Sequence, residues 1–260
     1  MPSGGPLHLF FNPNVIPCGP PAAPPPEVGP NNTIIVGLGP YKSGILSATL
    51  PTLTAEGVQV GDLLVAFMMV TNCPGFTTMA GGIPAGWTIV REDVNPGDGS
   101  VLGQPRPIYT GIAIKIAGSS DVAVNPSAYV FTSVQAMGVA ISCVRNTSGI
   151  DAISYSHAIN GGTLSVAGVA CAGGNEKILL LATAATIAGA MYVCAGSSGA
   201  DVTVNDLPLA TDYGSTDSAV RQFYMTGPAS PGTSTAHQIT QRSPAGDQYE
   251  TSGYQVSLLA

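Results

Sequence analysis

The sequence has 260 residues, enough for one large β domain or two small ones. Only 9% of the residues are charged, against about 25% in an ordinary soluble domain, and the net charge is −7. The eight lysines and arginines are scattered, so no basic cluster exists to meet phosphates, and the composition argues against nucleic-acid binding. A surface with so few charges is poorly protected against association, which suggests that partners cover much of it.

The five cysteines are widely separated and contain no C-x-x-C pair, so a zinc site is not expected (Cys18, Cys73, Cys143, Cys171 and Cys194). Their odd number fits free, buried thiols in a protein made in a reducing cytoplasm. A disulfide joining Cys143 to Cys171 is the less favoured alternative.

No signal peptide is expected, because the first basic residue is Lys42 and no apolar core follows Met1. The uncharged run Ile178–Cys194 is shorter than the ~20 residues of a membrane span and lacks flanking basic anchors. A buried strand, a turn near Gly189 and a second strand explain this run better, so no membrane partner is expected.

Residues 1–40 are rich in proline, which fixes φ and removes backbone donors, so extended chain or polyproline II is predicted. We expect an N-terminal arm with its own apolar anchors, which are Leu7, Leu9, Phe10, Phe11, Val15 and Ile16. The arm either folds back on its own domain or lies across a neighbouring subunit, and both alternatives stay open.

From Thr33 onward, short apolar or alternating segments bounded by Gly and Pro predict strands. In the first half they are Thr33–Leu38, Ser47–Leu53, Gly61–Val70, Gly86–Val90, Ile108–Ile116, Ala128–Phe131 and Gln135–Val144. The polar segment Arg91–Pro107 is predicted as a long loop, and long loops on a β-scaffold are where binding residues usually lie.

Asn146–Asp151 is predicted to turn the chain into its second half. Strands are expected near Ile153–His157, Thr163–Val169, Ile178–Thr186, Met191–Cys194, Val202–Val204, Leu207–Ala210, Ala219–Met225, Thr233–Ile239 and Tyr249–Leu259. No segment has a convincing amphipathic helical pattern. We therefore predict an all-β fold, an antiparallel β-sandwich that is jelly-roll-like.

One strand is repeated along the chain. In Gly61–Val70 a glycine-aspartate turn leads into eight apolar residues, which predicts a strand buried on both faces. A similar run, Asn175–Thr186, follows about 115 residues later. We predict two related halves, 41–145 and 146–260, that interleave into one β-sandwich domain, with the arm 1–40 outside it.

No pattern predicts catalysis, a cofactor or a metal site. Gly37–Pro40 lacks the third glycine and the helix of a nucleotide-binding loop, and Gly196–Gly199 lacks the spacing of a nucleophile elbow. Both are interpreted as turns or loops. The histidines lie in unrelated segments without ligand spacing (His8, His157 and His237).

Carboxylates gather in two predicted loop regions. The first holds Glu92, Asp93 and Asp98 beside Asn95, and the second holds Asp206, Asp212 and Asp217. We interpret them as solvated carboxylates. Binding of Ca²⁺ through their oxygens is the alternative, although the fixed alternation of a calcium loop is absent.

Four short segments carry a resemblance to a known family: Gly61–Phe67, Pro84–Thr88, Lys115–Gly118 with Tyr109, and Tyr129–Thr132. In this order and spacing they resemble the β-sandwich modules of tailed-bacteriophage virion proteins, of the tail fibre, receptor-binding or capsid-decorating type. The resemblance covers residues 58–144, and Trp87 stands where such modules place a tryptophan that closes a strand corner. The arm and the segment Gly161–Gly174 depart from the pattern.

The resemblance implies a non-enzymatic structural component of a virion, assembled with copies of itself and other virion proteins on the capsid or tail. The arm and the faces of the sandwich would make these contacts. The alternative is a tail-associated receptor-binding protein whose loops Arg91–Pro107 and Tyr213–Asp217 bind a host surface glycan. A hydrolase is the least favoured interpretation, because the sequence contains no recognisable nucleophile–base pair.

Overall fold

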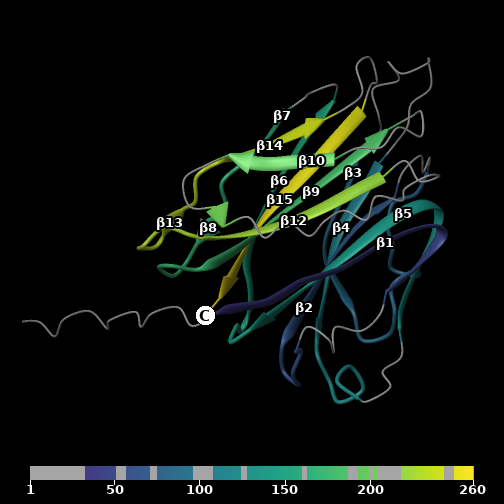
Figure 1. Ribbon diagram of the computed structural model, residues 1–260, viewed down its shortest axis with the longest axis horizontal. Helices are drawn as coiled ribbons and strands as arrows, with labels where there is room; N and C mark the ends of the chain where they lie inside the picture. Colours follow the sequence, from purple (N-terminus) through teal and green to yellow (C-terminus); the bar gives the residue numbers. More distant parts are fainter. Residues whose placement is uncertain are drawn as a thin grey trace, which may run out of the picture.

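The computed structural model describes residues 33–50, 57–70, 75–95, 108–123, 128–159, 163–186, 193–198, 202–203, 218–242 and 249–259. Throughout these residues the chain forms strands joined by turns and loops, and no helix occurs among them. Two five-stranded antiparallel sheets pack face to face (Figure 1). The prediction of an all-β fold of the sandwich type is confirmed.

The first half of the chain forms one sheet, which we call the N-terminal sheet. Its strands are β1 (Ile34–Leu50), β2 (Leu63–Val70), β3 (Thr88–Asn95), β4 (Ile108–Ile116) and β5 (Tyr129–Arg145). They lie in the order β1-β5-β2-β4-β3, and all neighbours are antiparallel. Residues 34–40, which the sequence analysis assigned to the arm, therefore belong to the sheet as the first part of β1.

The second half forms the C-terminal sheet, in the order β11-β12-β9-β15-β6. Its strands are β6 (Gly149–Ile159), β9 (Lys177–Thr186), β11 (Val202–Thr203), β12 (Ser218–Thr226) and β15 (Tyr249–Leu259). A three-stranded sheet, here called the cover sheet, consists of β10 (Val193–Ser198), β14 (His237–Arg242) and β7 (Thr163–Val166). The short strands β8 (Ala170–Cys171) and β13 (Gly232–Thr233) pair beside it.

The two five-stranded sheets repeat one strand order. β1, β5, β2, β4 and β3 correspond in place to β6, β15, β9, β12 and β11, with β2 and β9 at the centres. Each central strand is preceded by a residue of positive φ, Gly61 at 94° or Asn175 at 58°, and then by a buried carboxylate, Asp62 or Glu176. A positive φ favours glycine or asparagine, which is why these residue types occupy the turn.

Interleaving of the halves was expected, and the strand pairing corrects this. Among the described strands, each half completes its own five-stranded sheet, and the halves meet face to face through side chains. The chain passes from one sheet to the other in the short link between β5, which ends at Arg145, and β6, which begins at Gly149. The jelly-roll connectivity, in which the chain passes repeatedly between two sheets, is not confirmed by the described strands.

The inner core fills the space between the sheets. Alternate side chains of β2 point toward the C-terminal sheet and pack against β9 and β15 (Leu63, Val65, Phe67 and Met69). The other four side chains of β2 point to the opposite face, and all eight residues are buried. The Phe67 and Tyr254 rings meet edge to face with centroids 5.3 Å apart. The predicted strand buried on both faces is therefore confirmed for β2.

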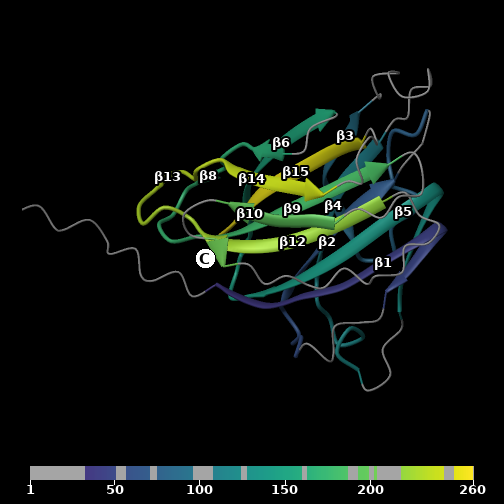
Figure 2. The same ribbon diagram turned by 45° about the horizontal axis from the view of Figure 1, so that its top comes forward.

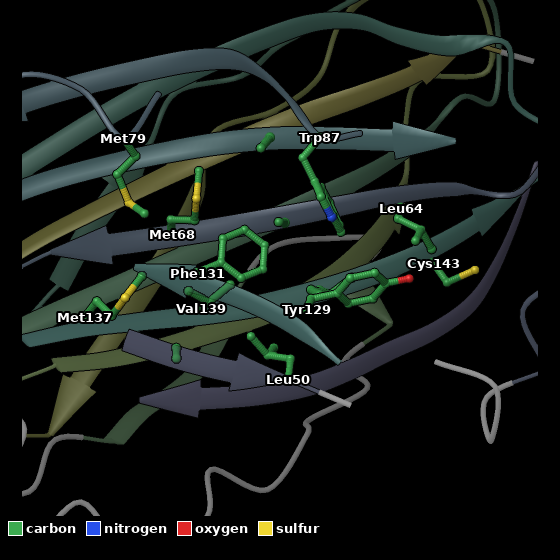
Figure 3. Packing of buried hydrophobic residues seen from close by; sticks show 14 of the residues in the cluster. Leu50, Leu64, Met68, Met79, Trp87, Tyr129, Phe131, Met137, Val139 and Cys143 are labelled. Carbon is green, nitrogen blue, oxygen red and sulfur yellow. The ribbon is translucent and has the colours of Figure 1, made fainter. Parts of the chain in front are cut away.

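A second core covers the outer face of the N-terminal sheet (Figure 3). β1 and β5 are 17 residues long each, and both bend where Leu46 adopts a φ of 65° and the pairing passes from Ile45–Ala136 to Ser47–Thr132. The ends beyond the bend carry Leu50, Tyr129 and Phe131 into contact with Trp87 and the outer side chains of β2.

This bend corrects several predicted boundaries. The segments Thr33–Leu38 and Ser47–Leu53 were expected to be separate strands, but the first lies mainly, and the second in part, in the single strand β1. Ala128–Phe131 and Gln135–Val144 likewise contribute to the one strand β5. Gly37–Pro40 is not a turn but part of β1, where register shifts flank Val36 and Pro40. Proline is tolerated there because β1 is an edge strand with bulges.

The cover sheet lies on the outer face of the C-terminal sheet, and polar side chains hold it there (Figures 1 and 2). Gln255 Nε2 donates to Val166 O at 3.2 Å and to Thr235 O at 3.0 Å, and Ser257 Oγ donates to Ala170 O at 2.8 Å. A Cβ added to Gly253 would lie 2.5 Å from Val166 Cγ2, so β7 packs directly on this glycine. The two five-stranded sheets are thus covered by different means on their outer faces.

The remaining boundaries differ from the prediction by a few residues. The expected strand Thr233–Ile239 is divided between β13 and β14, and β7 ends at Val166. β10 begins at Val193, and β11 consists of Val202 and Thr203. The expected strand Leu207–Ala210 lies outside the described residues.

Replacing Phe67 with alanine should destabilise the protein by about 3–5 kcal/mol, because a fully buried ring is lost and a cavity is left between the sheets. The measurement is the free energy of unfolding from urea titration. Val130→Ala is the control, since this side chain is 46% exposed and should change the free energy by less than about 0.5 kcal/mol. Equal losses in the two variants would contradict the assignment of the inner core.

Candidate functional site

A connected group of polar contacts lies where β3 and β4 of the N-terminal sheet face β6 and β15 of the C-terminal sheet. We call it the edge cluster. Its side chains come from strands far apart in the sequence: Arg91, Asp93 and Asn95 on β3, Thr110 on β4, Tyr155 on β6, and Ser252 and Tyr254 on β15. The cluster thus joins an edge strand of one sheet to the opposite sheet.

Asp93 is the centre of the cluster. Arg91 donates from Nε to Asp93 Oδ2 at 2.7 Å and from Nη2 to Oδ1 at 2.6 Å. Tyr254 donates its hydroxyl to Asp93 Oδ2 at 2.9 Å, and the same hydroxyl lies 2.7 Å from Thr110 Oγ1. A carboxylate that accepts a two-pronged guanidinium and a phenol is held in one orientation.

Tyr155 forms the second part of the cluster. Asn95 Nδ2 donates to the Tyr155 hydroxyl, which also lies 3.2 Å from Ser252 Oγ. The Arg91 guanidinium carbon lies 5.9 Å from the centroid of the Tyr155 ring, and the Tyr155 and Tyr254 rings are 4.8 Å apart. Ring contact and hydrogen bonds together fix β3 against β6.

The protonation states of the edge cluster suit a structural network of hydrogen bonds. Burial raises the pKa of Tyr254 and of Tyr155, so both remain neutral phenols that donate hydrogen bonds near neutral pH. The hydrogen bond to Asp93 raises the pKa of Arg91, which stays cationic. General acid–base catalysis requires a pKa near the working pH. The pKa values of Tyr254, Tyr155 and Arg91 are all shifted away from neutral pH.

Glu92 points to the other face of β3. Its Oε1 accepts the Tyr109 hydroxyl at 2.7 Å and the Met79 amide at 2.9 Å. Burial, followed by the contact with Glu92, raises the pKa of Tyr109, so this phenol also stays protonated. The interpretation of Glu92 and Asp93 as solvated loop carboxylates is therefore wrong, because residues 91–95 are part of β3 and both side chains are bound internally.

The other carboxylates of the two predicted loops lie outside the described residues: Asp98, Asp206, Asp212 and Asp217. Within the described ranges, no group of three or more His, Cys, Asp and Glu side chains is placed to hold a metal ion. The glycan-binding alternative, which depends on residues up to Pro107 and on Tyr213–Asp217, stays a prediction.

The structure does not bring the remaining site candidates from the sequence together in the part of the chain that it describes. His157 lies on β6 and the buried His237 on β14, where Thr235 Oγ1 is 3.3 Å from its Nε2. Gly196–Ser198 belong to β10 rather than to a loop. His8 and the arm residues Leu7, Leu9, Phe10, Phe11, Val15 and Ile16 lie outside the described residues.

Cys143 and Cys171 are free thiols, so the disulfide alternative between them is wrong. Burial, with Asp62 nearby, raises the pKa of Cys143 to about 12, and burial, with Glu176 nearby, raises the pKa of Cys171 to about 11. Both remain protonated near neutral pH and are poor nucleophiles.

Sequence analysis missed the edge cluster and the buried ion pairs. Asp62 receives Arg145 Nε at 2.9 Å on Oδ1 and Nη2 at 2.8 Å on Oδ2. Asp121 receives Lys115 Nζ at 2.6 Å and the Tyr129 hydroxyl at 2.7 Å. One signal was available: a charged residue beside an apolar strand in a chain this poor in charge needs a partner.

Comparisons with models of known protein families, with curated proteins and with solved structures found no match. The resemblance to virion β-sandwich modules therefore stays a prediction. In the described part of the chain no helix is long and apolar enough to cross a membrane.

Replacing Tyr254 with phenylalanine should cost about 1–3 kcal/mol of unfolding free energy, because Asp93 and Thr110 lose the buried phenol between the sheets. The cost is measured by urea titration. Tyr224→Phe is the matched control, because Tyr224 lies on β12 outside the cluster and is only half-buried. A Tyr254→Phe variant as stable as the wild type would contradict the role of the cluster.

Proposed function

We propose that this chain is a non-enzymatic structural component of a bacteriophage virion, assembling with copies of itself and other virion proteins on the capsid or tail. The bacteriophage virion is proposed as the particle because residues 58–144 resemble virion β-sandwich modules. The composition and the surface of the N-terminal sheet support association as the chain's role.

The observation that carries the proposal is the edge strand β3. Its charged side chains hold internal partners, Arg91 and Asp93 in the edge cluster and Glu92 at Tyr109, and the ion-paired Arg91 side chain is 41% exposed. Val90 and Val94 remain 38% and 41% exposed on the same strand. Edge strands of proteins that stay apart are usually protected by free outward charges. The exposed charge of β3 is already paired with Asp93, so β3 is suited to contact with another chain.

Elsewhere in the described part of the chain, as on β3, the cationic side chains contact internal partners. Arg91 and Arg145 bind aspartates, Lys115 binds Asp121, and Lys177 Nζ donates to Thr226 Oγ1 at 2.8 Å. These are all the lysines and arginines whose side chains the structure describes. Charges used inside the fold do not keep surfaces apart, which favours a permanent assembly.

The exposed apolar side chains also favour the N-terminal sheet as the contact surface. Every large apolar side chain that is exposed among the described residues belongs to the first half of the chain: Ile34, Leu46, Val60, Val90, Val94, Ile116 and Val130. Two of them are on β1 and two on β3, the two edges of the sheet.

Replacing Val90 and Val94 together with lysine should weaken self-association by about 100-fold or more. Burying an unpaired ammonium costs several kcal/mol, and each 1.4 kcal/mol corresponds to about tenfold in the association constant. The measurement is the molar mass over a concentration series, by sedimentation velocity or by light scattering.

Ser165→Lys is the control for this pair. Ser165 is exposed on β7 of the cover sheet, so the substitution adds a charge away from the N-terminal sheet and should leave association unchanged. A wild-type chain that stays monomeric at high concentration would refute assembly. If the β3 variant associates as strongly as the wild type, the contact surface must lie elsewhere on the molecule.

Deleting residues 2–30 should prevent incorporation into particles while leaving a folded domain, because the arm carries the apolar anchors Phe10, Phe11 and Ile16. Incorporation is measured as the fraction of protein that co-sediments with purified particles, and folding by circular dichroism. A shortened chain that enters particles as well as the full one excludes the arm from assembly.

A further inference from the structure

Glu176 lies at the base of a small lobe formed by residues 167–176 and 227–234, which we call the β8–β13 lobe (left in Figure 1). The two segments are joined by the β8–β13 pairing and by three backbone bonds near it: Gly227 N to Glu176 O and Asn175 N to Pro228 O, both 2.7 Å, and Ser234 N to Val169 O, 2.9 Å. Any opening of the lobe must separate these segments next to Glu176.

The Glu176 carboxyl is buried without a cation. The residue is 1% exposed, its Oε1 accepts the Gly173 amide, and its Oε2 has no hydrogen-bond partner among the described residues. The neighbouring base Lys177 donates to Thr226 instead. An ionised carboxylate that is buried and unpaired is costly, so the site favours the neutral acid.

Of the titratable groups around Glu176, Asp151 adds to this preference and Cys171 opposes it. From β6, the carboxylate of Asp151 faces it and accepts the Ala172 amide at 2.8 Å. From β8, the thiol of Cys171 lies near it and is itself protonated, and its interaction with the carboxyl lowers the pKa of Glu176. Burial, and then the charge of Asp151, raises the pKa of Glu176, although interactions with Gly173, Cys171 and Ala172 oppose this shift.

Asp62 occupies the equivalent place in the N-terminal sheet and provides an internal comparison. Leu63 pairs with Val144 and Lys177 pairs with Leu258, so Arg145 and Leu259 are equivalent residues. Burial opposes ionisation of Asp62, but the hydrogen bonds from Arg145 and the Gln59 amide outweigh it, and the pKa of Asp62 is lowered. The same position is thus ion-paired in one half and lacks its cation in the other.

We propose that Glu176 makes closure of the β8–β13 lobe sensitive to pH: the neutral acid keeps the lobe closed, and ionisation as the pH rises favours opening. This inference goes beyond assembly and does not depend on it. The direction follows from linkage, because a carboxyl that binds its proton more tightly in the closed state contributes full stability below its ordinary pKa of 4.5. That contribution is lost as the pH rises from 4.5 through the raised pKa.

The test compares amide hydrogen exchange of the intact wild-type chain and the Glu176→Gln variant, followed by mass spectrometry of peptides from the β8–β13 lobe. Both proteins are measured at each pH from about 4 to about 8, so the intrinsic pH dependence of exchange cancels in their ratio. The wild-type rate relative to the variant should rise by up to about tenfold per pH unit above pH 4.5, and then level off. A ratio that is constant over this range overturns the proposal.

Two further variants make the result specific. Asp151→Asn removes the nearby charge. The exchange rate of its lobe should begin to rise with pH as in the wild type. This rate should then level off at a lower pH and after a smaller fold-change. This comparison also carries the test if Glu176→Gln does not fold, and identical profiles for Asp151→Asn and the wild type would then count against it. Asp62→Asn is the matched control: exchange should increase near residues 57–63 and stay at the wild-type rate in the lobe.

Discussion

Each five-stranded sheet of this protein has a central strand that is buried on both faces, and the rest of the chain is arranged to satisfy that condition. β2 contains only apolar residues and β9 is largely apolar, so exposure of either face to water would be unfavourable. Packing the two sheets together covers one face of each strand. The opposite faces need further material, and the two halves supply it differently.

The N-terminal sheet covers its outer face with its own strands. The paired strands β1 and β5 are long enough to bend at Leu46 and to return across β2, where they bury Trp87 and the neighbouring aromatic rings. The C-terminal sheet uses extra segments instead. Its cover sheet is held through Gln255 and the close approach of β7 to Gly253, and the neighbouring strand β8 is held through Ser257. The two sheets share one strand order, but the outer face of the N-terminal sheet has an apolar cover, whereas hydrogen bonds help to hold the cover of the C-terminal sheet.

The scarcity of charge has consequences both inside and outside the fold. The four cations whose side chains are described all hold internal partners, so the ion pairs Asp62–Arg145 and Asp121–Lys115 and the edge cluster fix loops and strands. At β3 the exposed surface combines Val90 and Val94 with Arg91, whose charge is paired with Asp93. Where the second half lacks an equivalent of Arg145, Glu176 is left with a buried and unpaired oxygen. The distribution of a few cations therefore leaves the same position ion-paired in one half and without a cation in the other.

The sequence alone determined the fold class, the absence of helical patterns in the described segments, and the central strand β2, because an apolar run between turn residues is a local signal. The recurrence of that run marked the two halves whose sheets share one strand order. Only the tertiary structure decided that the halves stack face to face, that β1 and β5 are continuous through a bend, and that Arg91–Asn95 is a strand. It also brought Asp93 to Tyr254, a pair 161 residues apart in the chain. Such contacts depend on strand register and on which face each side chain takes, and a shift of one residue would reverse every face.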